Sequence, residues 1–535
     1  MNEKRNSIVI LAKNINMDKE YQNVIDYHEA DLVNLLRSVD HLVIEQNDYS
    51  FIKVGENRIS VQIPYTVCLQ ANYMAIQNPY YNNKWFFAFI NNVEYSSDKA
   101  TIINFTVDEI STWWDYFSKN KKSFVVREHV NDDTVGLHTV PEGLDTGDYI
   151  CNSSDSILYT NFHFVIQYVG TKEHPVARKA TNVNGILNPG SFYICSSYED
   201  YLTAIETIEN NPAWTVLNAY MIPSIFLGVD PINWSGIWAG KSTPTYTSKQ
   251  VTKQITLDGY TPVNNKLKCY PYNYLLELNN NGGSNILKYE MFTDNIPTFS
   301  IGGVCTVGGS IVSIPNNYKE GAESNMLVGG KFPSLAWASD SYTNWLTQEG
   351  VNIGGLDMSA TEYGTKMGKL KIGAGVLAGI ASLGLGGFGM PVAGNMITSG
   401  VDDIIDTMAS DYQHSKLPAT YHGNVNAGDF VTASGKNGFY FYKMSIKQEF
   451  AKSIDDFLTK FGYKVNSLKV PNFTGRQYFN YIQIGKSEII GLSNNVINIP
   501  DSSMDIINAV FRKGTTIWHN HDNIGNYSLD NSIIQ

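Results

Sequence analysis

Two glycine-rich motifs come close to the patterns that bind nucleotide phosphates. Residues 384–389, GLGGFG, satisfy the GxGxxG pattern, which requires a preceding strand and a helix that begins at the motif. Met390 and Pro391 follow directly instead. Residues 236–242, GIWAGKS, resemble a phosphate loop but have one residue too few between the glycines. Neither motif predicts nucleotide binding, and we expect no cofactor.

Histidine and carboxylate side chains near the C-terminus have the types that bind metal ions. If residues 519–521 form a strand, His519 and His521 point to the same face, with Asp522 next to them. A zinc site needs a third and usually a fourth ligand, and the sequence identifies none. We therefore favour a surface or interface role for this group and predict no metal site.

Catalysis by carboxylates or nucleophiles is not indicated either. Asp132-Asp133 and Asp402-Asp403 are paired only as neighbours in sequence, which does not create the separation that an acid/base pair needs. They are expected to be solvated loop charges. The sequence contains no GxSxG or HExxH motif and no cysteine–histidine signature. We predict no catalytic residues and a protein that is not an enzyme.

The elements that would position such groups are mostly strands. Residues 7–11, 59–63, 85–90 and 101–107 are short apolar or alternating runs separated by turn residues, which favours a β sandwich or barrel over a parallel sheet. We expect 85–90 and 101–107 to pair as a hairpin across 94–99. The fold class is therefore mainly β, with several domains.

One amphipathic helix is predicted over residues 446–461. Its apolar residues recur at helical spacing and form one buried stripe, whereas Lys447, Glu449, Lys452 and Asp455 lie elsewhere. Gly462 is a natural helix stop. The stripe consists of Ile446, Phe450, Ile454, Phe457, Leu458 and Phe461. The strands that follow are expected to complete the sheet that begins at the N-terminus.

The amino-acid composition limits the kinds of partner that the protein can bind. The chain has 535 residues and a net charge of -12, which opposes wrapping nucleic acid but suits a wall past which DNA slides without sticking. Its cysteines are odd in number, widely spaced and without a CxxC motif, which argues against zinc or disulfide frameworks and for synthesis in a reducing cytoplasm. They are Cys68, Cys151, Cys195, Cys269 and Cys305.

The segment 372–401 has no charged residue in an otherwise polar chain. Lysines precede it and aspartates follow it, so both ends favour water while the middle does not. We predict a loop, 367–408, whose tip leaves water and inserts into lipid. The inserting side chains are Ile372, Val376, Leu377, Ile380, Leu383, Leu385, Phe388, Met390, Val392, Met396, Ile397 and Val401.

The glycines of this loop decide how it inserts. A helix over 372–388 spans roughly 25 Å at ~1.5 Å per residue, which is short for a single membrane crossing. Glycines around Phe388, with Pro391, predict a bend there, and Gly375 and Gly379 form a small-xxx-small pattern that allows close helix packing in lipid. Such Gly/Ala-rich runs also occur as buried core helices, and composition alone leaves both interpretations open.

Five sequence blocks resemble a known family. They are FVVREHVNDDTVGLHTVPEGLDTGDYI at 124–150, LDGYTPVNNKLKCYPYNYLLELNNNGG at 257–283, FPSLAWASDSYTNWL at 332–346, FYKMSIKQEFAKSIDDFLTKFGYKVN at 441–466 and WHNHDNIGNYS at 518–528. In this order they resemble the tail knob proteins, also called distal tail tube, lower collar or major tail proteins, of small short-tailed phages of Gram-positive bacteria, of the Salasmaviridae and Rountreeviridae type.

The resemblance implies a β-rich homo-hexameric tube at the tip of the virion tail. It implies hydrophobic loops that plug the lumen, insert into the host cytoplasmic membrane and open a path for DNA. The implied partners are other phage tail proteins, membrane lipid, and viral DNA that passes without sequence-specific binding. In this chain the loop position is occupied by the uncharged segment 372–401.

Four ranges follow from these expectations. They are an N-terminal tube domain at 1–150, an inserted outer β domain at 151–330, a loop region at 331–425 and a C-terminal part at 426–535 that completes the tube domain. Two other functions stay open. The protein would be a receptor-binding adhesin if 151–330 recognised cell-wall glycan, or a passive tail tube if its loops never met lipid.

Overall fold

The computed structural model describes residues 7–534 except for 50–51, 56, 117–118, 120, 171–180, 184–185, 189–190, 212–213, 229–234, 239–244, 304–309, 320, 322–324, 333–351, 354–355, 358–435 and 487–498. The chain forms two compact units. The first comprises Met1–Thr146, Tyr260–Leu267 and Gln448–Gln535, and the second comprises Gly147–Gly259 and Lys268–Lys447.

A seven-stranded antiparallel sheet forms much of the first unit. Its strands, in spatial order, are β3 (Leu42–Tyr49), β1 (Ser7–Ala12), β6 (Tyr73–Gln77), β7 (Trp85–Ser97), β8 (Ala100–Val107), β5 (Arg58–Val61) and β4 (Ile52–Gly55). Along β1, Ile10 and Ala12 pack into one hydrophobic core while Val9 and Leu11 pack into a second. Because both faces are covered, this strand is a continuous apolar run rather than an alternating one.

The predicted hairpin is confirmed, with a different turn. β7 and β8 pair in antiparallel fashion from Ala88↔Val107 to Ser97↔Ala100. Beyond Ile90, where the predicted first strand ends, the register shifts between Ile90 and Asn92 and the pairing continues. The strand therefore continues through a bulge, and the turn is shorter than the expected 94–99.

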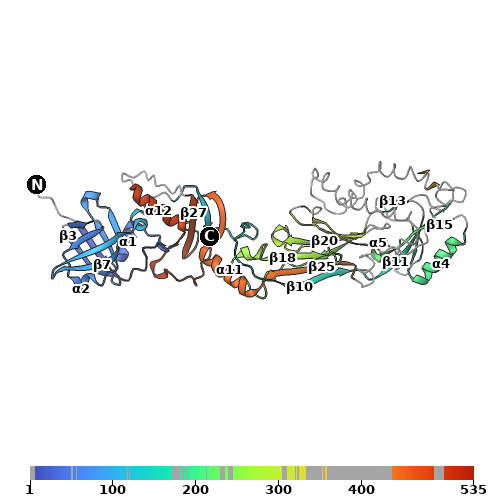
Figure 1. The fold of residues 1–535 in the computed structure, drawn as a ribbon, viewed down its shortest axis with the longest axis horizontal. Coiled ribbons are helices and arrows are strands. Elements are labelled where there is room, and N and C mark those ends of the chain that lie inside the picture. Colours follow the sequence, from blue (N-terminus) through green and yellow to red (C-terminus); the bar gives the residue numbers. More distant parts are fainter. Residues whose placement is uncertain are drawn as a thin grey trace. The chain divides into compact units, whose positions relative to one another are not determined.

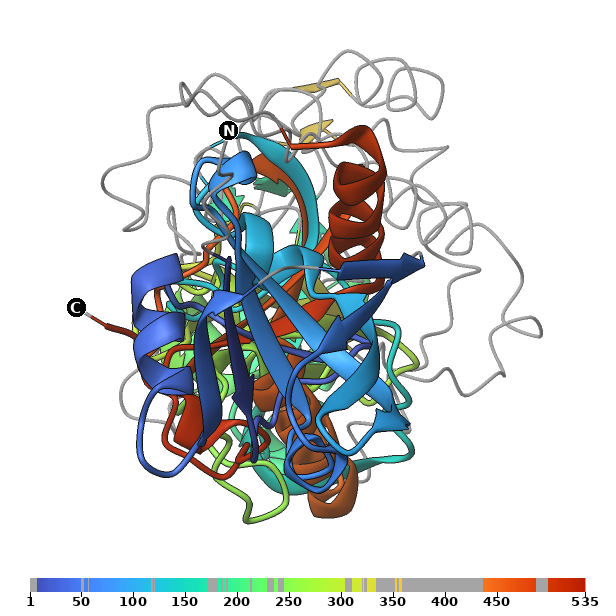
Figure 2. The same cartoon turned by 90° about the vertical axis from the view of Figure 1, so that its left-hand side faces the viewer.

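The C-terminal strands do not complete the sheet that begins with β1, so that expectation is wrong. They join other strands from the N-terminal part of the chain in a second sheet. The second sheet of this unit has the order β2 (Asn23–Ile25), β28 (Thr515–Trp518), β27 (Phe479–Lys486), β9 (Ser123–Glu128) and β26 (Tyr463–Lys469). β2 and β28 pair in parallel. Helix α12 (Asp501–Lys513, dark red in Figure 2) packs against β27 and the short helix α3 (Glu109–Trp113). Helices α1 (Glu29–Leu36) and α2 (Tyr65–Cys68) also belong to this unit.

The predicted amphipathic helix is α11 (Gln448–Phe461). It begins two residues late because Ile446 is the last residue of a strand, β25. Gly462 has φ +66 and donates its N–H to the Leu458 carbonyl at 2.8 Å, so the predicted stop is confirmed. The prediction for Asp455 is wrong, because this residue is only 1% exposed and lies among the buried residues of the helix.

Three four-stranded sheets dominate the second unit, and Figure 1 shows β10, β25 and β18 side by side. The first sheet is β10 (Tyr149–Leu158), β25 (Gly438–Ile446), β18 (Asn273–Leu278) and β19 (Ser284–Lys288). The second is β17 (Tyr246–Gln250), β20 (Thr298–Gly303), β21 (Ser310–Pro315) and β22 (Leu327–Lys331). The third is β15 (Trp214–Pro223), β11 (Phe162–Gly170), β14 (Ser191–Cys195) and β16 (Gly236–Trp238).

One hydrophobic core joins these sheets. Leu275 and Phe441 of the first sheet share it with Phe299 of the second and Val165 of the third. Helix α4 (Tyr198–Glu209) packs on the third sheet, and α5 (Ser224–Leu227) follows β15. Two small hairpins are also present, β12 (Thr181–Val183) with β13 (Ile186–Asn188) and β23 (Asn352–Ile353) with β24 (Leu356–Asp357). The mainly β fold class is therefore confirmed.

The boundaries of the two compact units differ from those of the four sequence ranges. β25 belongs to the second unit although it falls in the range 426–535, and residues Tyr260–Leu267 belong to the first. The roles assigned to the four sequence ranges stay predictions. Among the described residues, none of the helices is long and apolar enough to span a membrane.

Candidate functional site: the ends of the central segment

The residues predicted to enter lipid, from Ile372 to Val401, and the packing pair Gly375 and Gly379 lie outside the described residues. They belong to what we call the central segment, residues 333–435. The structure does describe almost all of the chain on either side of it. The geometry of those two ends is therefore the observable part of the predicted site.

The outgoing end is anchored in the core of the second unit. β22 pairs with β21 through Val312↔Val328 and Ser313↔Leu327. Phe332, directly after the strand, is 1% exposed and packs into the hydrophobic core shared by the three sheets. The chain is thus held firmly up to the residue where the central segment begins.

The returning end enters the same core. Asn437 accepts a hydrogen bond from the Tyr159 N–H at 2.8 Å, and β25 then runs between β10 and β18. Phe439 and Phe441 are fully buried, and the Phe441 ring lies 4.6 Å from that of Phe299. Phe332 on the outgoing side belongs to the same group of buried residues, so both ends rest on one support.

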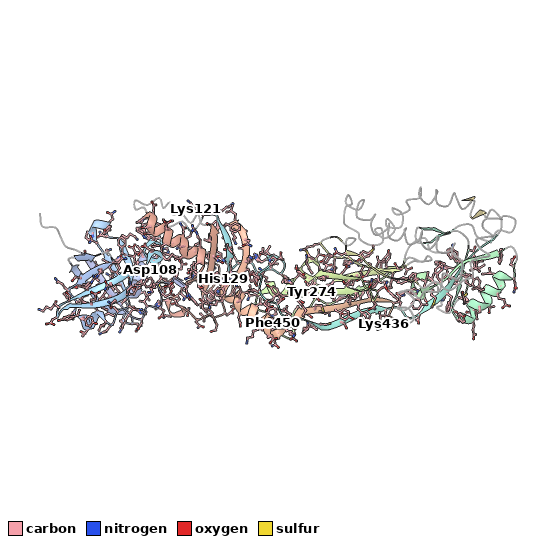
Figure 3. All side chains as sticks on the ribbon, viewed as in Figure 1. Asp108, Lys121, His129, Tyr274, Lys436 and Phe450 are labelled. Atoms are coloured by element: carbon pink, nitrogen blue, oxygen red, sulfur yellow. The ribbon has the colours of Figure 1, made fainter. Side chains whose placement is uncertain are left out.

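A single turn contacts both ends. In the β18–β19 hairpin, the side-chain amide of Asn279 donates to the Val328 carbonyl of β22 at 2.7 Å. The side-chain amide of the next residue, Asn280, donates to the Lys436 carbonyl at 3.0 Å; Figure 3 labels Lys436. Because adjacent residues bind both strands, the central segment leaves and re-enters the fold at neighbouring points.

The returning end has a backbone conformation that requires glycine. Gly438 has φ +148, and a Cβ atom there would lie 2.0 Å from the Ile157 carbonyl oxygen. We expect Gly438→Ala to lower the free energy of unfolding by about 1–3 kcal/mol from backbone strain alone, with the clash adding to this loss. Thermal unfolding of the full-length protein measures it.

Gly282→Ala is the matched control for that variant. Gly282 also has a positive φ, +86, but a Cβ atom there meets nothing within 4 Å. Its substitution should therefore show the cost of strain without a clash. Equal losses for the two variants would mean that the close approach of β25 to Ile157 is not rigid.

A buried carboxyl group lies between the strands that hold these ends. Glu277 of β18 pairs with Asn285 of β19 and with Phe441 of β25 and is fully buried. Burial raises the pKa of Glu277 to about 8, and the Ser313 and Asn285 side chains oppose this shift only in part. The side chain is therefore mostly protonated at neutral pH.

Glu277 makes stability depend on pH. Its ordinary pKa is 4.5, so between that value and about 8 the folded protein holds a proton that the unfolded chain has lost. The contribution of this group to stability is therefore fully present below pH 4.5 and falls as pH rises toward 8, by about 1.4 kcal/mol for each unit of pKa difference at most. We expect Glu277→Gln to remove this loss, raising the thermal midpoint at pH 8 more than at pH 5. Glu199→Gln, at an exposed position, should not change the thermal midpoint in this pH-dependent way. Equal gains for Glu277→Gln at both pH values would contradict the assignment.

Three of the blocks that resemble the tail knob family meet in the first unit. Glu142 from the first block has a fully buried side chain and accepts from Arg127 of the same block and from Lys266 of the second. It also accepts from the Lys464 N–H of the fourth block at 3.0 Å. We call Arg127, Glu142 and Lys266 the buried charge cluster.

Asp455 explains why a charged residue sits inside α11. Its carboxylate accepts from the Tyr260 hydroxyl at 2.8 Å and from the N–H groups of Val263 and Asn264 at 2.7 and 3.0 Å. The Asn264 side-chain amide adds a further hydrogen bond at 2.8 Å. Asp455 thus holds the segment Tyr260–Leu267 against α11.

The other carboxylates and the histidines agree with expectation only in part. Asp132 is a solvated loop charge as predicted, but Asp133 accepts from the Tyr463 hydroxyl at 2.5 Å and the Asn265 N–H at 3.1 Å. His519 and His521 do not share a strand face, because β28 ends at Trp518. His519 contacts Asn480 at 3.0 Å, whereas His521 lies in a 3-10 turn (His521–Asn523) beside His41.

A small pocket opens on the third sheet of the second unit. It has a volume of about 220 Å³ and combines aromatic rings with one carboxylate, that of Asp200, which accepts from Ser235 at 2.8 Å. The aromatic residues are Tyr168, Tyr193 and Trp214. Rings and hydrogen-bonding groups of this kind suit a sugar, so the pocket bears on the adhesin alternative.

Comparison with known proteins agrees with the resemblance. Residues 240–532 match the family model of the C-terminal domain of tail knob protein gp9 of Bacillus phage phi29. Residues 5–121 match the model of the caudoviral major tail protein N-terminus. The tail knob proteins gp9 of Bacillus phages PZA and phi29 are 27% and 26% identical to this chain, over 92% of each protein.

A solved structure supports the fold over the whole chain. The tail knob protein gp12 of bacteriophage C1 superimposes with a TM-score of 0.59 at 15% sequence identity, covering 99% of this chain and 100% of that one. At that identity the likeness concerns the fold.

Proposed function

The chain belongs to the phage tail knob family of phi29 gp9 and is a structural component of a short-tailed virion, and on this premise we propose that it forms the homo-hexameric tube through which the genome leaves. In this proposal the central segments of six copies plug the lumen. On infection their apolar side chains insert into the host cytoplasmic membrane and form a pore for DNA.

The observation that carries the proposal is the arrangement at the two ends of the central segment. Asn279 and Asn280 bind Val328 and Lys436, one on each side, and both sides are anchored in the same core. A segment that departs and returns at neighbouring points can change its surroundings without unpairing β22 or β25. This is what a loop that moves from lumen to lipid requires.

The chemistry of the segment supports the same conclusion. Its uncharged stretch, 372–401, exposed on a virion would promote aggregation, so it needs shelter until use. In lipid its backbone groups must be paired internally or by neighbouring copies, and six copies in one ring provide a high local concentration for that packing. The net charge of -12 suits a wall that does not retain DNA.

Two measurements on the purified full-length protein test the proposal. Electron microscopy should show six-fold rings with a blocked centre. Liposomes loaded with a self-quenched dye should leak when the protein is added, and leakage at neutral and acidic pH shows whether protonation of Asp402, Asp403 and Asp406 helps release. Intact rings that never cause leakage would make the protein a passive tube.

The pocket on the third sheet favours one second candidate, recognition of cell-wall glycan by the tail. Trp214 and Tyr168 have ring centroids 5.6 Å apart beside Asp200. A pulldown with purified host cell wall tests it. Binding that is lost in Trp214→Ala and kept in a variant of an exposed aromatic residue elsewhere, Tyr81→Ala, would support the adhesin function.

A further inference from the structure

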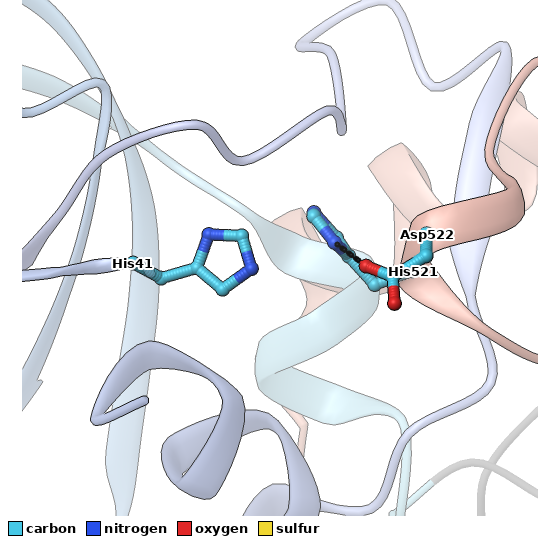
Figure 4. Close-up of side chains that lie close together, drawn as sticks. All are labelled: His41, His521 and Asp522. Carbon is cyan, nitrogen blue, oxygen red and sulfur yellow. Dashed lines mark ion pairs between the residues drawn. The ribbon is translucent and has the colours of Figure 1, made fainter. Parts of the chain in front are cut away.

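Three side chains that are distant in sequence meet in the first unit. Among the residues that the structure describes, His41, His521 and Asp522 form a group in which each offers one ligand atom, and these atoms all lie within 4.8 Å of one another (Figure 4). His41 lies in the loop before β3, and His521 and Asp522 lie in the turn after β28. The two imidazole rings meet edge to face with centroids 4.8 Å apart.

Each of the two histidines has one ring nitrogen that is not used in a hydrogen bond with the other residues that the structure describes and that faces the other residues of the group. His41 is 9% exposed, and its Nδ1 lies 3.1 Å from the Lys13 carbonyl oxygen. A carbonyl only accepts, so Nδ1 carries the proton and Nε2 has the free lone pair. His521 is 2% exposed, and its buried Nδ1 has no hydrogen-bond partner in the described part of the chain. An Asp522 carboxylate oxygen lies 3.5 Å from this nitrogen.

We propose that His41 Nε2, His521 Nδ1 and the Asp522 carboxylate bind one Zn²⁺ ion. Imidazole nitrogen and carboxylate oxygen are zinc ligands, and three protein ligands with a water in the fourth position make a tetrahedral site. Asp522 has an 81% exposed side chain, which leaves a route from solvent for the ion and for that water. The hydrogen bond to the Lys13 carbonyl fixes the tautomer and the orientation of the His41 ring, as such hydrogen bonds do for zinc-binding histidines in general.

The geometry needs a small adjustment. Zinc–nitrogen bonds of about 2.0 Å place tetrahedral ligand atoms roughly 3.3 Å apart, close to the 3.5 Å between His521 and Asp522. The widest pair must close by roughly 1.5 Å on that scale. Because His521 and Asp522 are already 3.5 Å apart, this movement falls mainly on the loop that carries His41.

Zinc also selects a tautomer of His521. Without the ion, Nε2 accepts a hydrogen bond from the Asn16 N–H at 3.3 Å, which leaves the ring proton on Nδ1. With the ion on Nδ1, the proton moves to Nε2 and that long hydrogen bond is given up. The ring stays neutral in both states, and no proton is lost overall.

A bound zinc ion would cross-link two segments that lie near opposite ends of the chain. The ion would tie the loop between α1 and β3 to the turn that follows β28. Because these residues come together only in the folded unit, zinc stabilises the fold by mass action. A structural site of this kind makes the first unit sensitive to chelators.

The experiment uses the full-length protein, treated with EDTA and then freed of chelator. Isothermal titration with Zn²⁺ should give one ion per chain and a rise in the thermal midpoint. Co²⁺ in the same site should show the visible absorption of a tetrahedral complex. Asp522→Asn, an exposed change that leaves the core intact, should weaken zinc binding by at least about tenfold, since even the loss of a residue that only hydrogen-bonds to a metal ligand costs that much. His41→Gln should weaken it similarly.

His28→Gln is the matched control. His28 also lies beside a carboxylate, Asp115, at 2.5 Å, but its side chain is 72% exposed, and zinc binding should be unchanged in this variant. No saturable zinc binding by the unmodified protein would overturn the proposal. Binding that is equally strong in Asp522→Asn and His41→Gln would do the same, because the ion would then lie elsewhere.

Discussion

Deletion of residues 371–402 is expected to leave ring assembly intact and to abolish dye release from liposomes. The deletion removes the uncharged stretch but begins and ends far from Phe332 and Lys436, where the fold holds the chain. The sheets that bind both ends, and therefore the assembled particle, should be unaffected. Particle shape by electron microscopy and leakage on the same preparation measure the two outcomes separately.

A double substitution shows whether membrane activity needs the apolar character of the stretch or only its length. Leu383→Asp combined with Leu385→Asp keeps the length of the segment but places two charges in it, and each charge costs several kcal/mol at the centre of a bilayer. Leakage should fall at least tenfold. Asn395→Ser, a polar exchange in the same stretch, should release as much dye from the liposomes as the unmodified protein does. Full leakage by the deletion variant would show that another part of the chain disrupts the membrane.

Glu142→Ala is expected to cause a large loss of stability in the first unit. Arg127 and Lys266 are 8% and 5% exposed, and both donate to this one carboxylate. Removing it leaves two buried cations without their shared partner, which costs about 3–5 kcal/mol. Urea unfolding of the full-length protein should show an early transition of the first unit.

Two controls identify the cause of that loss. Glu45→Ala removes the partner of Arg37, bonded at 2.7 and 3.0 Å in a pair whose side chains are 39% and 22% exposed, and should cost at most about 1 kcal/mol. A triple variant with apolar residues at all three positions of the buried charge cluster should recover much of the stability, since no buried charge is left unpaired. A Glu142→Ala variant as stable as Glu45→Ala would show that water reaches the cluster.

Local pattern predicted the elements well where one period dominates. The 3.6-residue spacing and Gly462 located α11 to within two residues, and the two apolar runs at 85–90 and 101–107 paired as expected. The predicted boundaries differ from the observed ones because the bulge beyond Ile90 and the end of β25 at Ile446 depend on which strands pair. Both are decided by tertiary contacts.

The sequence alone determined the mainly β class, the family blocks and the uncharged stretch, because each is a property of neighbouring residues. Only the tertiary structure decided that Asp455 is buried, that Asn279 and Asn280 hold both ends of the central segment, and that His41 lies against His521. These contacts join residues far apart in the chain. Which residues become partners depends on how the sheets pack, and the local periodicity of apolar residues carries no information about that packing.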